Sequence, residues 1–308
     1  GAINEFVGIA RAGRIRGQIS HFNVRHDSNA PQDAWRRAVD IMENAQKEGL
    51  DITADTTPFR EGIGAMYAIL PRSLVNQGAK AIAEAAGDPA MRRELRTQCD
   101  RYWRFIHKGQ WHRVSLEGSP NFPELQGLSF PQISQILGKD EWDCYFDIMA
   151  AAGEQCMNLI MVGQLFTEAH LAEMISHPDF SLGVDGYTST IHGPLSEVTA
   201  SQHPYCGQIE YLAHHVRELG TLTLETAIHK MTMKPAERFR IKKRGIVKEG
   251  YFADLVLFDP KTVASKSTIQ NPQVYPDGIT AVLVNGEIVV HNGVHNGARP
   301  GRVLRRAS

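Results

Sequence analysis

Residues 17–59 read GQISHFNVRHDSNAPQDAWRRAVDIMENAQKEGLDITADTTPF and contain a strand, a helix and a second strand. Residues 17–23 predict a short buried strand that runs into polar side chains, and residues 34–48 place apolar side chains on one helical face. Residues 51–55 form the next strand, which Pro58 ends because proline cannot extend a central ladder. A strand–helix–strand unit of this length predicts a right-handed crossover between parallel strands.

The rest of the sequence predicts an α/β body up to about residue 240 and a small β domain after it. Residues 158–162 and 180–185 are typical of short buried strands. Helices are expected at residues 89–107, twice within 130–153, and at 167–176, 209–219 and 222–239. Residues 245–260 and 279–291 alternate apolar and polar side chains, with Gly and Asn at the turns, which predicts antiparallel strands.

The composition is that of an ordinary globular protein of 308 residues, a length that favours about two domains. Lys and Arg total 33 and Asp and Glu total 34, so bulk charge gives no reason to expect a nucleic-acid or membrane partner. No apolar run reaches the roughly 18 residues of a membrane helix. The 4 cysteines form no C-x-x-C pair, which excludes a disulfide or zinc-finger framework and favours the cytoplasm.

Polar side chains end three of the predicted strands, at His21, Asp55 and Asp185. Functional groups of parallel α/β sheets and barrels lie at the carboxyl ends of the strands. A strand-end His and Asp can ligate a divalent metal, or the Asp can act as a general base toward a metal-bound water. Both residues also have structural interpretations, as a hydrogen-bonded core histidine and a turn-forming aspartate. The residues alone leave these alternatives open.

The other histidines are weaker candidates for a metal or substrate site. His26, His192 and His203 follow predicted strand ends, so they can face the same edge of the sheet as His21 and Asp185. His214 and His215 are adjacent on a predicted helix, so their side chains point about 100° apart and cannot easily share an ion.

Several motifs, taken in chain order, carry a resemblance to a known family. They are ISH at 19–21, LDITAD-x-x-PF at 50–59, SPNFPELQG at 119–127, VDG at 184–186, KMT-x-x-PAERF at 230–239, GIVK-x-GY-x-ADLVLFDP at 245–260, YPDGI at 275–279, AVLVNGEIVV at 281–290 and RPGRVLRR at 299–306. Together these motifs resemble the D-aminoacylase (N-acyl-D-amino-acid deacylase) family of the metal-dependent amidohydrolase superfamily, over essentially the whole chain.

The resemblance implies an α/β fold in two parts. Residues 1–240 are expected to be the C-terminal part of a TIM-like (β/α)8 barrel, with an irregular insertion at about 60–130. Residues 241–308 are expected to be part of a small β-sandwich with a C-terminal tail. Only about 20 residues precede His21, so the family's N-terminal β segment and its H-x-H pair are expected to be missing. The barrel is then expected to need that segment or a companion chain to fold, and a homo-oligomer remains open.

The resemblance also implies a zinc-dependent hydrolase that cleaves a linear amide in an N-acyl-D-amino acid. By the family's pattern His21 is a metal ligand, and Asp185 contacts the metal and shuttles the proton. Two alternatives remain open. One is an amidohydrolase of a cyclic, carbamoyl or aromatic amide, and the other is an inactive paralogue that serves as a scaffold.

The expected substrate-binding residues depart from the family's pattern. Its S-H-H-K, Y-P-Y and H-P-R motifs correspond here to Ser20-His21-Phe22-Asn23, Thr57-Pro58-Phe59 and, loosely, His203-Pro204-Tyr205. The residues expected to bind substrate are therefore Asn23, Thr57, His203 and Tyr205. Because Asn23, Thr57 and Tyr205 carry no positive charge, we expect weak activity on simple N-acetyl-D-amino acids. A less acidic or bulkier aromatic amide is expected instead, with Phe22 and Phe59 as pocket walls.

Overall fold

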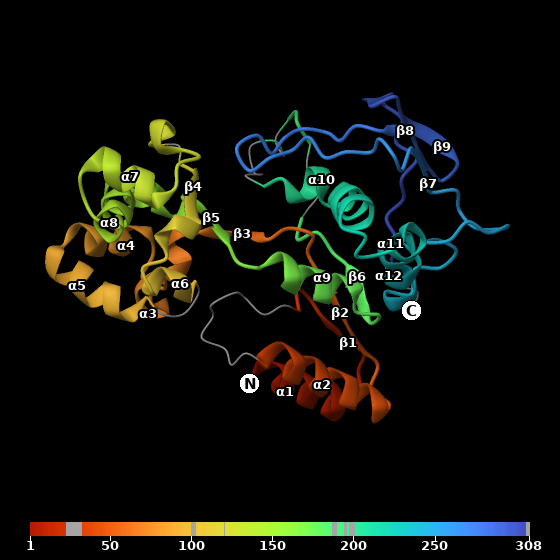
Figure 1. Cartoon of the computed structure of the whole chain (residues 1–308), viewed down its shortest axis with the longest axis horizontal. Coiled ribbons are helices and arrows are strands. Elements are labelled where there is room, and N and C mark those ends of the chain that lie inside the picture. Colours follow the sequence, from red (N-terminus) through yellow and green to blue (C-terminus); the bar gives the residue numbers. More distant parts are fainter. Residues whose placement is uncertain are drawn as a thin grey trace. The chain divides into compact units, whose positions relative to one another are not determined.

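The computed structural model of the chain (Figure 1) describes residues 1–22, 33–99, 103–119, 121–186, 190–193, 196 and 201–305. The chain divides into two units. Arg60–Thr167 form one unit, and the described residues before Arg60 and after Thr167 form the other. The unit made of the residues before Arg60 and after Thr167 is called the sheet unit here, because it contains the two parallel strands predicted within residues 17–59.

A parallel three-stranded sheet organises the sheet unit. Its strands are β1 (Gly17–Ile19), β2 (Ile52–Thr56) and β6 (Phe180–Leu182), in the order β1-β2-β6. Helix α2 (Ala34–Lys47) lies between β1 and β2 in the chain and these strands are parallel, so the predicted crossover is confirmed. The strand predicted at residues 17–23 is shorter than expected, because the chain leaves the extended conformation at His21, where φ is 51°.

Helices cover this sheet and bury its apolar side chains. They are α1 (Ala2–Gly13), α2, α9 (Glu168–Ser176), α10 (His203–Glu210), a π-helical segment (Tyr211–Glu218), α11 (Leu224–Met231) and α12 (Met233–Arg238). Helices α1 and α2 lie side by side along β1 and β2 (Figure 1). The core is closely packed there, because Val39, Met42, Ala54 and Phe180 have no exposed surface.

The helix predicted at residues 222–239 is two helices, with Thr232 between α11 and α12. Pro235 explains the break. Proline has no N–H to donate and its ring clashes with the carbonyl four residues earlier, which here belongs to Met231, the last residue of α11.

Lys230, on α11, hydrogen-bonds the backbone at the end of α9 and in the connection to β6. Its side chain, on α11, is 2 % exposed, and its Nζ donates to the carbonyl of His177 at 2.6 Å and to the carbonyl of Ile175. Burial, with a smaller contribution from the neighbouring Lys234, lowers the pKa of Lys230 to about 8. The folded chain therefore releases this proton more readily than the unfolded chain does.

We expect Lys230 to make the free energy of unfolding rise between pH 8 and pH 10.5. In that window the unfolded chain still holds the proton and the folded chain has lost it, so stability increases with pH. At about 1.36 kcal/mol per pKa unit, the rise is roughly 3 kcal/mol. Urea unfolding of the wild type and of Lys230→Met at both pH values measures it, because the variant lacks the rise. Parallel pH dependences in the two proteins contradict this assignment.

The unit formed by Arg60–Thr167 contains an antiparallel sheet. Its strands are β3 (Glu61–Ala65), β5 (Ile160–Gln164) and β4 (Val114–Gly118), in the order β3-β5-β4. The strand predicted at residues 158–162 is β5, so its existence is confirmed. Its neighbours in this sheet are antiparallel.

Helical segments enclose that sheet. They are η1 (Met66–Ile69), α3 (Arg72–Val75), α4 (Ala79–Gly87), α5 (Pro89–Gln98), α6 (Arg104–His107), η2 (Trp111–Arg113), η3 (Pro123–Leu125), α7 (Phe130–Leu137), α8 (Glu141–Ala152) and η4 (Gly153–Asn158). The two helices predicted within 130–153 are confirmed. Ser129 and Gln132 form a capping box at the start of α7, and the Asp140 side chain caps α8.

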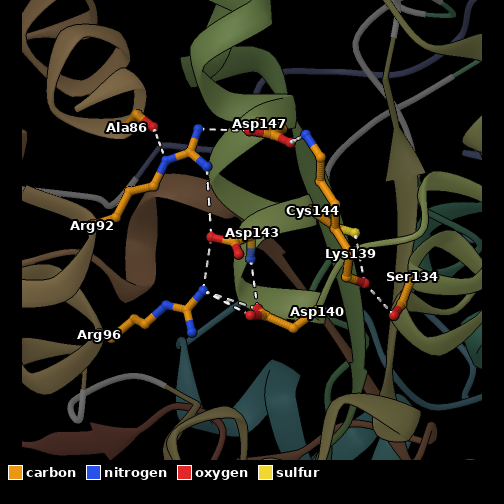
Figure 2. A network of polar contacts seen from close by, with 9 residues as sticks. All are labelled: Ala86, Arg92, Arg96, Ser134, Lys139, Asp140, Asp143, Cys144 and Asp147. Carbon is orange, nitrogen blue, oxygen red and sulfur yellow. Dashed lines mark hydrogen bonds and ion pairs between the residues drawn. The ribbon is translucent and has the colours of Figure 1, made fainter. Parts of the chain in front are cut away.

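Ion pairs fasten α5 to α8 (Figure 2). Arg92 Nη2 donates to Asp147 Oδ1 at 2.6 Å, and Arg96 Nη2 donates to Asp143 Oδ1 at 2.8 Å. Lys139, in the turn before α8, donates to the other oxygen of Asp147 at 2.5 Å. Although partial burial opposes it, these hydrogen bonds from Lys139 and Arg92 hold the pKa of Asp147 below its ordinary value. Each carboxylate in Figure 2 thus has a cationic partner, which is typical of a structural network.

A separate antiparallel sheet follows the helices of the sheet unit. Its order is β10-β9-β8-β7, with β7 (Leu255–Phe258), β8 (Ile279–Val284), β9 (Glu287–His291) and β10 (Val294–His295). Asn285 and Gly286 join β8 to β9 with φ values of 51° and 86°. A two-residue turn with both φ values positive is the connection that an Asn-Gly pair favours. The antiparallel strands predicted here are confirmed. Among the described residues, no helix has the length and apolar character needed to cross a membrane.

Candidate functional site

The carboxyl ends of the three parallel strands surround one cavity of about 360 Å³. The cavity is lined by Ser20, His21, Asp55, Gly183, Val184, Asp185 and Gly186. Ser20 and His21 follow β1, Asp55 lies near the end of β2, and residues 183–186 follow β6. The three strand-end side chains singled out in the sequence are therefore brought together, because parallel neighbours end at one edge of a sheet.

Asp55 holds the turn that follows β1. Its Oδ1 accepts the backbone N–H of His21 at 2.8 Å and the hydroxyl of Ser20 at 3.3 Å. Its Oδ2 accepts Gln18 Nε2 at 2.9 Å, and its backbone carbonyl accepts the N–H of Phe22 at 2.9 Å. Both carboxylate oxygens of Asp55 thus accept hydrogen bonds from the protein. The bond from the His21 N–H fixes the position of the His21 backbone.

His21 and Asp185 face each other across the cavity. His21 Nε2 lies 3.7 Å from Asp185 Oδ1, and the two side chains are 35 % and 59 % exposed. Both residues have φ of 51°, in the left-handed region. Such a conformation costs a non-glycine residue about 1–3 kcal/mol and is found disproportionately at functional sites. The pair therefore has the accessibility and the conformational strain that are typical of a reacting or ligand-binding site.

The His21–Asp185 pair fits two ligands of one zinc ion. Zinc binds histidine nitrogen and carboxylate oxygen at about 2.0–2.2 Å, so two donor atoms 3.7 Å apart can reach the same ion. In the part of the chain that the structure describes, no group of three or more His, Cys, Asp or Glu side chains is placed to hold a metal. The pair would supply two of the four positions that a zinc ion usually fills.

His203 lies beside this pair, at the start of α10. Its ring is 4 % exposed and stacks on Phe59, with centroids 4.5 Å apart. Burial lowers the pKa of His203, and the negative charge of Asp185 opposes this only in part, so the ring is neutral near pH 7. Among the described residues, Nδ1 of His203 has no hydrogen-bond partner. Hydrogen bonds to the backbone at Val184 and Asp185 also act against the lowering of this pKa, so the ring contacts the segment that carries Asp185.

Two glycines allow α10 to approach the segment that carries Asp185. A Cβ at Gly207 would lie 2.8 Å from Val184 Cγ1, and a Cβ at Gly186 would lie 3.1 Å from the backbone of Pro204. The contact therefore depends on the absence of side chains at both positions, and it brings His203 next to Asp185.

The other expected substrate-binding residues are placed differently. Thr57 and Tyr205 are 5 % and 7 % exposed and do not line the cavity. The Tyr205 hydroxyl donates to the carbonyl of Thr190 at 3.1 Å. Asn23 lies outside the described residues. Phe22, expected as a pocket wall, instead packs in the core against Trp35 and Phe180.

Comparison with known proteins shows which proteins the chain resembles. Residues 150–290 match the model of the amidohydrolase family. The chain is 35 % identical over 197 residues to N-acyl-D-aspartate deacylase and 33 % identical over 189 residues to D-aminoacylase, both from Alcaligenes xylosoxydans xylosoxydans. These alignments cover 62 % and 61 % of this chain and 36 % of each relative. Over these residues the chain is similar to D-aminoacylases.

Solved structures of D-aminoacylases share the fold. One is N-acyl-D-glutamate deacylase from Bordetella bronchiseptica with zinc and a phosphonate inhibitor, with TM-score 0.72, 23 % identity, and coverage of 99 % of this chain and 53 % of that chain. Another is D-aminoacylase, with TM-score 0.70, 24 % identity and the same coverage. The chain therefore spans about half the length of these solved structures and about a third of the curated relatives.

Sequence reasoning did not find every residue that shapes this cavity. Gln18 reads as an ordinary polar position of a half-buried strand, and Tyr211 as part of an apolar helix face. Only the structure shows Gln18 against Asp55 and the Tyr211 hydroxyl against the strand ends. The Asp-Gly pair at 185–186 and the position of His203 before Pro204 were the available signals for the residues that were found.

We expect Asp55→Asn to weaken zinc binding about 10- to 100-fold, the usual effect of removing a group that orients a ligand. The variant places an N–H₂ group where an oxygen accepts from His21, Ser20 or Gln18, so the turn loses one acceptor. Asp51→Asn is the matched control, because Asp51 begins the same segment and pairs with Arg238 at the opposite end of β2. Zinc competition titrations compare the variants. Equal zinc affinity in the two variants contradicts the role given to Asp55.

Proposed function

We propose that this chain carries part of the active site of a zinc-dependent amidohydrolase that cleaves a linear amide of the N-acyl-D-amino-acid type. The observation that carries the proposal is the 3.7 Å separation of His21 Nε2 and Asp185 Oδ1 at the carboxyl ends of parallel strands. Similarity to D-aminoacylase supports the reaction class, and the zinc in the solved N-acyl-D-glutamate deacylase supports the metal.

The residues of the cavity have distinct parts in the proposed reaction. His21 and Asp185 would hold the zinc, and Asp55 keeps His21 in place through its backbone N–H. When bound, zinc lowers the pKa of a water toward about 7 and polarises the amide carbonyl. The Asp185 carboxylate accepts the proton of the attacking water and delivers it to the leaving amine. Because its side chain is exposed, Asp185 can contact both the attacking water and the leaving amine.

We also propose the larger architecture on which this site depends. Strands β1, β2 and β6 belong to the C-terminal part of a (β/α)8 barrel over residues 1–240, with the insertion expected at about 60–130. The sheet β7–β10 belongs to part of a small β-sandwich over residues 241–308. The likeness to the solved D-aminoacylase fold over 99 % of this chain supports both assignments.

His203, Thr57 and Tyr205, with Asn23, are proposed to shape the substrate pocket. The unpartnered Nδ1 of the buried, neutral His203 supports a contact to a substrate atom. Asn23, Thr57 and Tyr205 are uncharged, so a free α-carboxylate meets no cation from these positions. Hydrogen bonds to a carboxylate from neutral donors are about half as strong as those from cations.

We expect an amide or ester of an N-acyl-D-amino acid to be a better substrate than the free acid, by about tenfold in kcat/KM. A panel that pairs each free acid with its amide, including aromatic amides, measures this on the complete protein. A clear preference for the free carboxylate contradicts the expectation.

Hydantoin and dihydropyrimidine in the same panel test the proposed amide class. Turnover of these cyclic amides alone would replace the linear-amide proposal. No turnover together with substoichiometric zinc would identify an inactive scaffold.

A further inference from the structure

The π-helical segment presents two buried polar side chains to the strand ends. Tyr211 and His215 have no exposed surface. The Tyr211 hydroxyl contacts the carbonyl oxygen of Gly183 at 2.8 Å and that of Thr56, and His215 Nε2 lies 2.8 Å from the carbonyl oxygen of Pro58. Stretches of π-helix are rare and occur frequently at functional sites. Neither side chain lines the cavity.

The Tyr211 hydroxyl lies where β2 and β6 come to an end. The Thr56 carbonyl also accepts the N–H of Gly183 at 2.9 Å, which is a hydrogen bond between the ends of β2 and β6. The Tyr211 hydroxyl therefore contacts the carbonyl oxygens of both residues that this hydrogen bond joins. The Gly183 carbonyl belongs to the planar peptide unit between Gly183 and Val184. By holding that oxygen, Tyr211 fixes the orientation of the peptide plane immediately before the Val184–Asp185 peptide.

Burial keeps the hydroxyl a permanent donor, because it raises the pKa of Tyr211 well above its ordinary value. Asp185, in contrast, is exposed and has a positive φ, so its own conformation is strained. The segment that carries it has to be held from outside. Tyr211 holds this segment at Gly183, and α10 packs against it at Val184 and Gly186.

We propose that Tyr211 is a positioning residue for Asp185: its hydroxyl holds the Gly183–Asp185 segment so that the carboxylate faces His21. The proposal rests on the proposed function for its effect on turnover, and on the geometry alone for its effect on the backbone. A tyrosine that only filled space or added stability would not act through Asp185.

Tyr145 provides a matched control. It has no exposed surface, its hydroxyl donates to one backbone carbonyl, that of Met66, at 2.8 Å, and burial also raises its pKa well above the ordinary value. It belongs to the other unit of the chain. Tyr145→Phe therefore removes the same buried atom as Tyr211→Phe, in the unit that does not contain Asp185.

Hydrogen exchange of the metal-free complete protein tests the effect on the backbone. In Tyr211→Phe, amide exchange in a peptide covering residues 182–186 is expected to accelerate about tenfold or more, because local opening becomes easier. In Tyr145→Phe the same peptide exchanges as in the wild type. Installing 4-aminophenylalanine at position 211 keeps a donor there and restores slow exchange. Unchanged exchange in Tyr211→Phe overturns the proposal.

A double-mutant cycle with Asp185→Asn tests the effect on turnover. Tyr211→Phe alone is expected to lower kcat about tenfold with KM within twofold, and to cause no further loss in the Asp185→Asn background, because interacting residues are not additive. An equal loss in both backgrounds overturns the proposal. If Asp185→Asn itself keeps normal turnover, the proposed function fails, and the exchange result alone decides whether Tyr211 positions Asp185.

Discussion

Asp185→Asn is expected to lower turnover by about 10²-fold or more while zinc binding is largely retained. The amide keeps the shape of the side chain and one oxygen that can contact the metal, but it has no basic oxygen pair to take and return the water's proton. Turnover and zinc content measured on the same preparations separate these two effects.

Asp40→Asn is the matched control for this substitution. Asp40 lies on α2, is half exposed and pairs with Arg36, and it is not among the residues that line the cavity. Its replacement should leave turnover unchanged. Near-normal turnover of Asp185→Asn would show that the proton is carried by another group.

His21→Ala is expected to weaken zinc binding by more than 100-fold and to abolish turnover with it. Removing a group that only orients a metal ligand lowers metal affinity about 10- to 100-fold. Because His21 is proposed as a ligand itself, its removal is expected to cost more. The substitution removes the imidazole nitrogen 3.7 Å from Asp185 and leaves the carboxylate without its partner.

His229→Ala is the control for His21→Ala, because His229 is an exposed histidine on α11. Metal competition titration of both variants gives the comparison. Tight, stoichiometric zinc in His21→Ala would remove His21 from the metal site.

The central crossover could be predicted from the sequence because its signals are local. Apolar spacing marks α2, and the polar residues at the strand ends mark His21, Asp55 and Asp185 as neighbours at one edge. Parallel strands then bring those ends together without further information. The Asn285–Gly286 turn is equally local, since both residues accept a positive φ.

The features that could not be predicted depend on contacts between distant parts of the chain. The apolar run of β5 does not show that its partners are β3 and β4 rather than the parallel strands. The role of Asp55 as an anchor requires Gln18 and His21 to lie opposite its carboxylate. Tyr211 is an apolar-face residue in the sequence, and its contact with Gly183 arises only when the helix packs on the strand ends.

The position of zinc in crystals of the complete protein tests the account most directly. Diffraction data collected on both sides of the zinc absorption edge locate the ion without reference to activity. We predict an anomalous peak about 2.0–2.2 Å from both His21 Nε2 and Asp185 Oδ1. A fully occupied zinc site that contacts neither residue would contradict the proposed site and the reaction derived from it.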